Sequence, residues 1–228
     1  MIGCPPPRPV DTVRRVGGAR RPRRSPPGCQ RLDEKTLAAV DATTVLASAN
    51  EVLTDVEAVV RNVDASALGE ASGCGTWSIR DLLNHMTFEN YAHAALAEGG
   101  HDMPTPDATT DYLAGDHVTS YTDSVTRVRS ALAAPGLLDR TFGPQEAPGS
   151  FVVQMLVNEM LTHGWDLARA TGQPTDLAPN AAAKALPAAK VFYGDHPRGA
   201  TSFQPEPEAP PTATAADRLA AFLGRDPA

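Results

Sequence analysis

Residues 150–171 read SFVVQMLVNEMLTHGWDLARAT, and this stretch decides the fold that the sequence predicts. Gly172 and Pro174 follow it, as is typical after the end of a helix. At about 100° per residue, one stripe of such a helix is largely apolar. Its apolar members are Val152, Met155, Leu156 and Ala170. We therefore predict a core-facing helix over residues 150–171.

Three more segments have helical periodicity. Apolar residues three or four apart predict helices over residues 37–63, 78–98 and 110–134, separated by stretches rich in glycine and proline. Ser78 precedes Asp81 by three residues, a variant of the capping box that marks a helix start. Four helices of about 20 residues each predict an all-α fold, an antiparallel four-helix bundle whose core can hold ligands.

The predicted bundle covers residues 32–173 and is flanked by two segments of different composition. Residues 1–31 hold eight arginines, one acidic residue and seven prolines, without apolar periodicity, so we expect a disordered basic leader. Residues 174–228 form a proline-rich C-terminal extension, with short helices expected at 180–191 and 215–223. We interpret this extension as an appendage to the bundle.

Charge and hydropathy exclude several classes of function. Beyond residue 31 the chain has 12 basic and 26 acidic residues. Such a body repels phosphate backbones and anionic lipid, so either could bind only through the basic leader. We expect no nucleic-acid partner and no membrane association. The longest nearly apolar run, residues 151–157, is far shorter than the roughly 20 residues that cross a bilayer. We expect a cytoplasmic monomer or homodimer, without a secretory signal.

Cysteine spacing predicts neither a metal knuckle nor a structural disulfide. Cys4, Cys29 and Cys74 form no C-x-x-C pair. Cys74 precedes the second predicted helix and fits a small turn residue better than a nucleophile, because no histidine adjoins it in sequence.

The stripe on residues 150–171 also carries three polar side chains, Glu159, His163 and Asp166. Burying a carboxylate costs several kcal/mol unless it is paired or binds a metal, so this stripe needs an explanation. The second predicted helix places His85 on its apolar face, and a bundle can bring His85 opposite His163. Two imidazoles, one carboxylate and an open position form an arrangement known for catalytic zinc.

Other interpretations of these residues stay open at this point. Glu159 and His163 could form a simple buried ion pair, and His85 could bond to a backbone or carboxylate partner. His93 and His117 also lie on inner faces and could join or replace the set.

Two further residues are candidates for the site. Asp166 could orient a ligand histidine, act as a general base, or be a surface acid near Arg169. Arg80 belongs to the start of the second helix and could bind an anionic substrate or cofactor.

Three motifs carry a resemblance to a known family. The segments Trp77-Ser-Ile-Arg-Asp-Leu-Leu-Asn-His85 and Glu159-Met-Leu-Thr-His163-Gly-Trp-Asp166-Leu-Ala-Arg-Ala-Thr-Gly-Gln173 resemble the DinB-like metal-binding family. Within it, the chain is similar to the actinobacterial branch related to mycothiol-dependent maleylpyruvate isomerase. The segment Asp217-Arg-Leu-Ala-Ala-Phe-Leu-Gly-Arg-Asp226 resembles the usual ending of that branch. The resemblance covers approximately residues 37–226.

The resemblance implies one divalent metal ion, held by His85, Glu159 and His163. It further implies chemistry on a low-molecular-weight thiol of the mycothiol type, in which the metal stabilises a thiolate that attacks an electrophile. Zinc is the expected ion, with nickel or iron as alternatives. The isomerase itself has a substantial C-terminal domain, whereas only the proline-rich extension follows here.

We expect a metal-dependent thiol transferase or isomerase. Two alternatives remain: a non-catalytic metal-binding or stress-response module, and a metal-dependent hydrolase.

Overall fold

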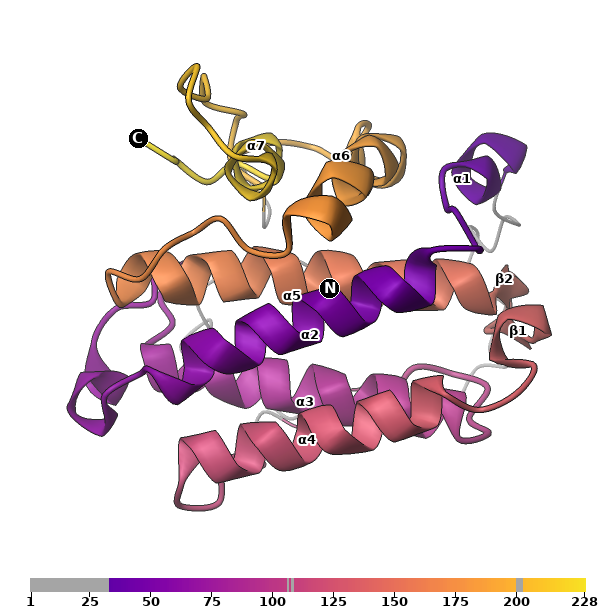
Figure 1. Cartoon of the computed structure of the whole chain (residues 1–228), viewed down its shortest axis with the longest axis horizontal. Coiled ribbons are helices and arrows are strands. Elements are labelled where there is room, and N and C mark those ends of the chain that lie inside the picture. Colours follow the sequence, from indigo (N-terminus) through magenta and orange to yellow (C-terminus); the bar gives the residue numbers. More distant parts are fainter. Residues whose placement is uncertain (1–32, 106, 108, 200–202) are drawn as a thin grey trace, which may run out of the picture.

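The computed structural model describes residues 33–105, 107, 109–199 and 203–228. The predicted leader, residues 1–31, lies outside them. Four long helices form the body of the molecule (Figure 1): α2 (Val45–Arg61), α3 (Ile79–Ala97), α4 (His117–Leu132) and α5 (Gly149–Ala170). The all-α four-helix bundle predicted from the sequence is confirmed.

The four helices run in two directions. At one end of the bundle, Gln173 just beyond α5 donates to the Val59 carbonyl in the last turn of α2, at 3.1 Å. Arg80 at the start of α3 bonds to Asp111 ahead of α4, at 2.8 Å. Thus α2 and α5 run one way and α3 and α4 the other, and a long connection returns along the bundle from α3 to α4 (Figure 1). In this arrangement α3 and α5 are antiparallel neighbours.

The predicted first helix is divided in two. A short helix α1 (Glu34–Ala38) ends well before α2 begins at Val45. Between them the Asp41 carboxylate accepts hydrogen bonds from the Thr43 amide at 3.0 Å and from the Thr44 hydroxyl at 2.7 Å. Such local side-chain bonds compete with the helix ladder, which apolar periodicity alone does not reveal.

The start of α4 also differs from the prediction. Residues 110–116 are loop, because Gly115 has a φ of 113° and cannot continue a helix. Asp116 then caps α4 by accepting from the Thr119 amide at 2.9 Å. The start of α3 is as predicted, since Ser78 and Asp81 form the expected capping box.

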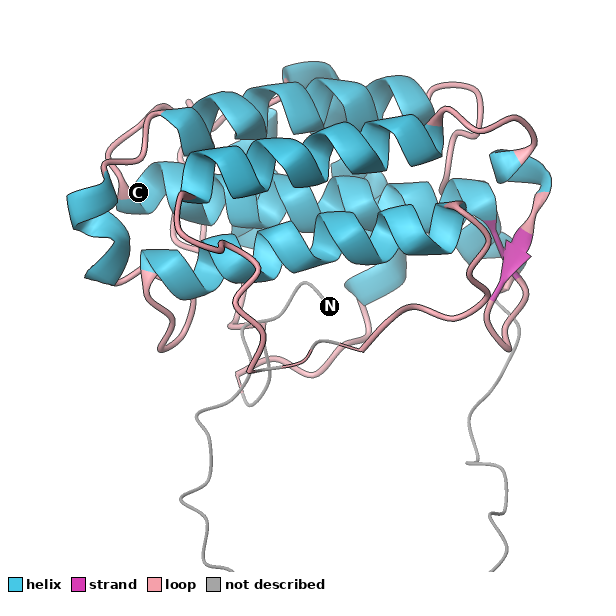
Figure 2. Cartoon of the chain, turned by 90° about the horizontal axis from the view of Figure 1, so that it is seen from below, coloured by secondary structure: helices cyan, strands magenta, loops and turns pink. Residues whose placement is uncertain are grey.

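Short elements close the ends of the bundle. They are the 3₁₀ turns η1 (Ala65–Gly69) and η2 (Leu137–Asp139), and the strands β1 (Thr141–Phe142) and β2 (Ala147–Pro148). The two strands pair antiparallel, with Thr141 opposite Pro148, at the end of the bundle where α5 begins (Figure 2).

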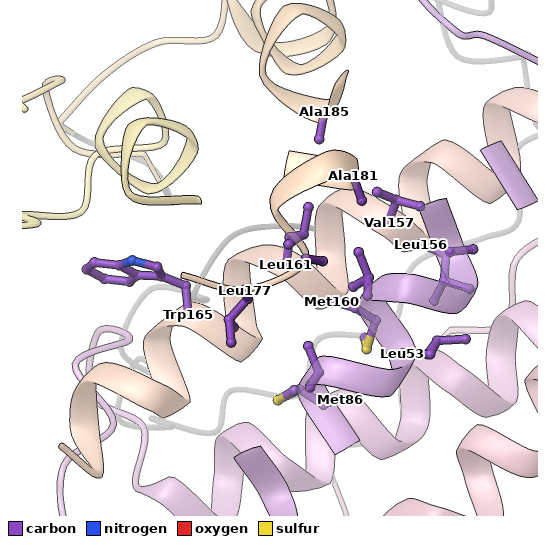
Figure 3. Packing of buried hydrophobic residues seen from close by; sticks show 14 of the residues in the cluster. Leu53, Met86, Leu156, Val157, Met160, Leu161, Trp165, Leu177, Ala181 and Ala185 are labelled. Atoms are coloured by element: carbon purple, nitrogen blue, oxygen red, sulfur yellow. The ribbon is translucent and has the colours of Figure 1, made fainter. Parts of the chain in front are cut away.

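The C-terminal part of the chain packs onto α5. Its helices α6 (Pro179–Tyr193) and α7 (Ala215–Phe222) lie against each other and both contact α5. Figure 3 shows Ala181 of α6 close to Val157 and Leu161 of α5. Further along, the Trp165 indole donates to Asp217 of α7 at 2.8 Å. One side of α5 is therefore covered by residues that follow it in sequence.

Close packing of α2 on α5 depends on Gly164. A Cβ atom at this position would lie 2.5 Å from Cγ2 of Val56 in α2. The glycine therefore lets the two helices approach at the residue next to His163.

Among the described residues, no helix combines the length and the apolar composition that spanning a membrane requires.

Candidate metal centre

Three potential metal ligands meet between α3 and α5. One ligand atom each from His85, Glu159 and His163 lie within 4.8 Å of one another. His163 and Glu159 are buried, with 0% and 2% of their surface exposed. His85 comes from the antiparallel neighbour α3 and keeps 12% of its side chain accessible. The helical stripes that the sequence singled out thus converge on one point.

The geometry of this cluster suits a cation. Oε1 of Glu159 lies 2.8 Å from Nε2 of His85 and 3.4 Å from Nε2 of His163. Nε2 of His163 is buried and has no hydrogen-bond partner among the described residues. An orphaned imidazole nitrogen beside a carboxylate and a second imidazole is the donor set that zinc and similar ions prefer. The residues present therefore fit a divalent metal ion.

Asp166 determines which nitrogen of His163 carries the proton. Oδ2 of Asp166 lies 3.1 Å from Nδ1 of His163, and a carboxylate can only accept, so Nδ1–H donates. This leaves the lone pair on Nε2, which faces Glu159. A carboxylate that orients a histidine in this way is the usual support of a metal ligand.

Asp166 is in turn held by Arg225, which the helical stripes did not indicate. The guanidinium donates from Nε to Oδ1 at 3.1 Å and from Nη2 to Oδ2 at 3.0 Å. Arg225 lies just beyond α7, 59 residues from Asp166. The only sequence signal was its place in the segment 217–226 that resembles a family ending.

The electrostatics of the site favour positive charge between the carboxylates. Burial raises the pKa of Asp166, but Arg225 and His163 outweigh it and the net shift is downward. Burial likewise opposes ionisation of Glu159, yet the adjacent His163 and His85 imidazoles hold its pKa well below the ordinary value. For His163, burial lowers the pKa, whereas Asp166 and Glu159 raise it above the usual value. A divalent ion can take the place of the second proton that His163 would otherwise bind at Nε2.

Comparison with known families agrees with this geometry. The profile described as "Mycothiol maleylpyruvate isomerase N-terminal domain" matches residues 49–168, a span that contains all three potential ligands and Asp166. The chain belongs to this family. As a member of the mycothiol maleylpyruvate isomerase N-terminal domain family, it carries α6, α7 and Arg225 outside the matched span.

Relatives of this family member include two curated proteins of Mycobacterium tuberculosis. They are the uncharacterized protein MT0763 of strain CDC 1551 / Oshkosh and the uncharacterized protein Rv0738 of strain H37Rv. Each is 36% identical over 171 residues, which cover 74% of this chain and 90% of the relative. No solved structure matches the chain.

The remaining predicted residues lie apart from the cluster. Arg80 pairs with Asp111 at 2.8 Å, and both side chains are exposed. His117 bonds through Nε2 to the Val63 carbonyl at 3.2 Å, and His93 bonds through Nδ1 to a backbone carbonyl of its own helix. Neither histidine belongs to the group of converging donors. The proposed base role of Asp166 and substrate role of Arg80 stay predictions.

Cys74 adjoins the site from the turn before α3. Its sulfur lies within 4.8 Å of donor atoms of His163 and Asp166. Cys74 is 1% exposed, as expected of a small turn residue, and the other two cysteines, Cys4 and Cys29, lie outside the described residues. In the alternative group of Cys74, His163 and Asp166, the carboxylate already pairs with Arg225. The candidate centre in this family member is therefore the set of His85, Glu159 and His163.

Proposed function

We propose that the protein is a divalent-metal-dependent enzyme that acts on a low-molecular-weight thiol, in the mycothiol-type transferase or isomerase class. The observation that carries the proposal is the buried cluster in which Nε2 atoms from α3 and α5 both face one oxygen of Glu159. Membership in a family described by a mycothiol-dependent isomerase supports the same class. The substrates would be a small-molecule thiol and an electrophile.

In this proposal His85, Glu159 and His163 hold the ion. Their nitrogen and oxygen donors suit zinc first, with nickel or iron as alternatives. A bound ion of this kind keeps a coordinated thiol or water deprotonated near neutral pH. Since three protein donors leave a position open, the open position is where the thiol would bind.

Surrounding residues orient the ligands and shape the site. Asp166 retains the Nδ1 proton of His163 and so points Nε2 toward Glu159. The Trp77 ring packs beside the His85 ring, with 5.0 Å between the two ring centroids. Arg80 would have to leave Asp111 in order to contact an anionic co-substrate.

Metal content and thiol-dependent turnover test the proposal together. Elemental analysis of the purified protein should find close to one divalent ion per chain, and His163→Gln should remove it. His117→Gln is the matched control, because it changes a buried histidine that bonds to a backbone carbonyl away from the cluster. Thiol transfer should then be screened with mycothiol and other thiols against a panel of electrophiles, with and without the ion.

Each other outcome favours a different function. Bound metal without turnover on any pair would favour the non-catalytic binding module. Metal-dependent hydrolysis without thiol would favour the hydrolase. A wild-type protein that binds no divalent ion would refute the proposal.

A further inference from the structure

A second buried carboxylate lies on α3, one turn beyond His85. Glu89 has 5% of its surface exposed. Its Oε1 lies 4.0 Å from Nδ1 of His85, and its Oε2 lies 3.7 Å from Nδ1 of His93. The three side chains follow one another at four-residue spacing, so Glu89 stands between two imidazoles on the inner face of the helix.

The two imidazoles of the candidate centre are placed alike. His163 turns Nε2 toward Glu159 and Nδ1 toward Asp166. His85 turns Nε2 toward Glu159 and Nδ1 toward Glu89. Each ring therefore lies between Glu159 and another buried carboxylate.

The proton of a ligand histidine explains why this placement matters. An imidazole that binds a cation through Nε2 keeps its proton on Nδ1 and needs an acceptor there. For His163 the acceptor is Asp166. For His85, the carboxylate that faces Nδ1 is Glu89, and a small side-chain rotation closes 4.0 Å to hydrogen-bond length.

His93 flanks Glu89 one turn further along α3. Its Nδ1–H donates to the Glu89 carbonyl at 2.9 Å, which fixes the ring against this turn of α3. The ring is 4% exposed, and its Nε2 is buried with no hydrogen-bond partner among the described residues. The fixed His93 ring therefore lies beside the Glu89 carboxylate, with Nδ1 of His93 3.7 Å from Oε2.

We infer that Glu89 is the positioning residue for His85, as Asp166 is for His163. It acts through the imidazole and does not contact the ion. The inference rests on the proposed function in one respect, namely that His85 is a metal ligand.

Metal affinity measured by competition with a chelator tests this role. Glu89→Gln keeps the shape of the side chain and removes the carboxylate, and should weaken binding by roughly 10- to 100-fold, the usual effect of losing the partner of a ligand. Glu98→Gln is the control, since Glu98 caps the end of the same helix and pairs with Arg127 at the surface. Affinity within about twofold of the wild type would overturn the inference. So would a loss as complete as that of Glu159→Gln, which would make Glu89 a ligand.

A second readout does not depend on a metal. In the metal-free protein, ¹⁵N NMR of the imidazole nitrogens should show that Glu89→Gln shifts the His85 signals and leaves those of His163 in place. Unchanged His85 signals would overturn the inference. If the wild type bound no ion, the proposed function would fail, and the NMR comparison would still decide whether Glu89 positions His85.

Discussion

Arg225 donates to both oxygens of the Asp166 carboxylate, at 3.1 and 3.0 Å. Because Asp166 also holds Nδ1 of His163 at 3.1 Å, one chain of hydrogen bonds leads from the segment after α7 to the centre between α3 and α5. The Arg225 side chain is only 10% exposed, so this pair is shielded from water. Its loss should therefore affect both the fold and the ligand histidine.

Replacing Arg225 tests this chain of contacts. Arg225→Met leaves the Asp166 carboxylate buried without its cation, and should destabilise the protein by about 3–5 kcal/mol. Metal affinity should fall as well, because Asp166 no longer holds His163 in place. Urea denaturation and chelator competition measure the two effects. Arg218→Met serves as the control, since Arg218 in α7 is exposed and, among the described residues, bonds to a backbone carbonyl. A similar loss there would argue against a specific role for Arg225.

Comparing the loss of metal affinity in two variants distinguishes a metal ligand from a residue that orients a ligand. Glu159→Gln replaces the anionic donor with a neutral amide and should nearly abolish metal binding. Asp166→Asn should retain the ion with affinity lowered by roughly 10- to 100-fold. Both are measured by chelator competition at one pH. Equal or reversed losses would mean that Asp166 coordinates in place of Glu159.

Gly164 offers a test of packing beside the site. Gly164→Ala introduces a Cβ atom 2.5 Å from Cγ2 of Val56, so we expect the free energy of unfolding to fall by about 1–3 kcal/mol. Val56→Ala removes the opposing methyl groups, and the double variant should therefore lose less than the sum of the two single variants. Strict additivity in urea titrations would show that the helices do not meet at this point.

Asp217 should give the stability a pH dependence on the acid side. Burial raises its pKa, but hydrogen bonds from Trp165, Thr214 and Thr175 outweigh it, so the folded-state pKa lies below the ordinary value of 3.8. Such a group stabilises the fold above its unfolded pKa, and this contribution is lost as the pH falls through the folded value. The wild type should thus exceed Asp217→Asn in Tm at pH 7 and pH 5, with the difference shrinking below about pH 4.

A control isolates the effect of this carboxylate. Asp195→Asn changes an exposed residue after α6 and should leave Tm nearly unaltered at every pH. A difference between wild type and Asp217→Asn that is independent of pH would contradict the account.

The sequence predicted those helix ends that local chemistry determines. The start of α3 follows from the Ser78 and Asp81 capping box, and the end of α5 from Gly172. The break before α2 and the late start of α4 were missed, because an Asp41 side-chain turn and a positive φ at Gly115 leave the apolar periodicity intact. Apolar periodicity indicates which face of a helix is buried, but it does not indicate the residue at which the helix begins.

The sequence likewise predicted some residues of the candidate site and missed another. His85, Glu159 and His163 were found because each lies on an apolar stripe of its own helix, and the structure brings them together. Their binding of a metal stays a prediction. Arg225 was not found, because its contact with Asp166 depends on how α7 docks on α5, and no spacing within a helix contains that information.

Because Arg225 bonds to Asp166, docking of the C-terminal segment and binding of an ion at the centre should be thermodynamically linked. If docking of the tail improves the affinity of His163 for an ion, the ion must favour docking by the same factor. A bound ion would then stabilise the docked position of residues 215–226. Protease digestion of that segment would therefore slow as the ion concentration rises. Conversely, a C-terminal fusion that weakens docking of this segment should lower the affinity for the ion, although the fusion contacts none of the ligands.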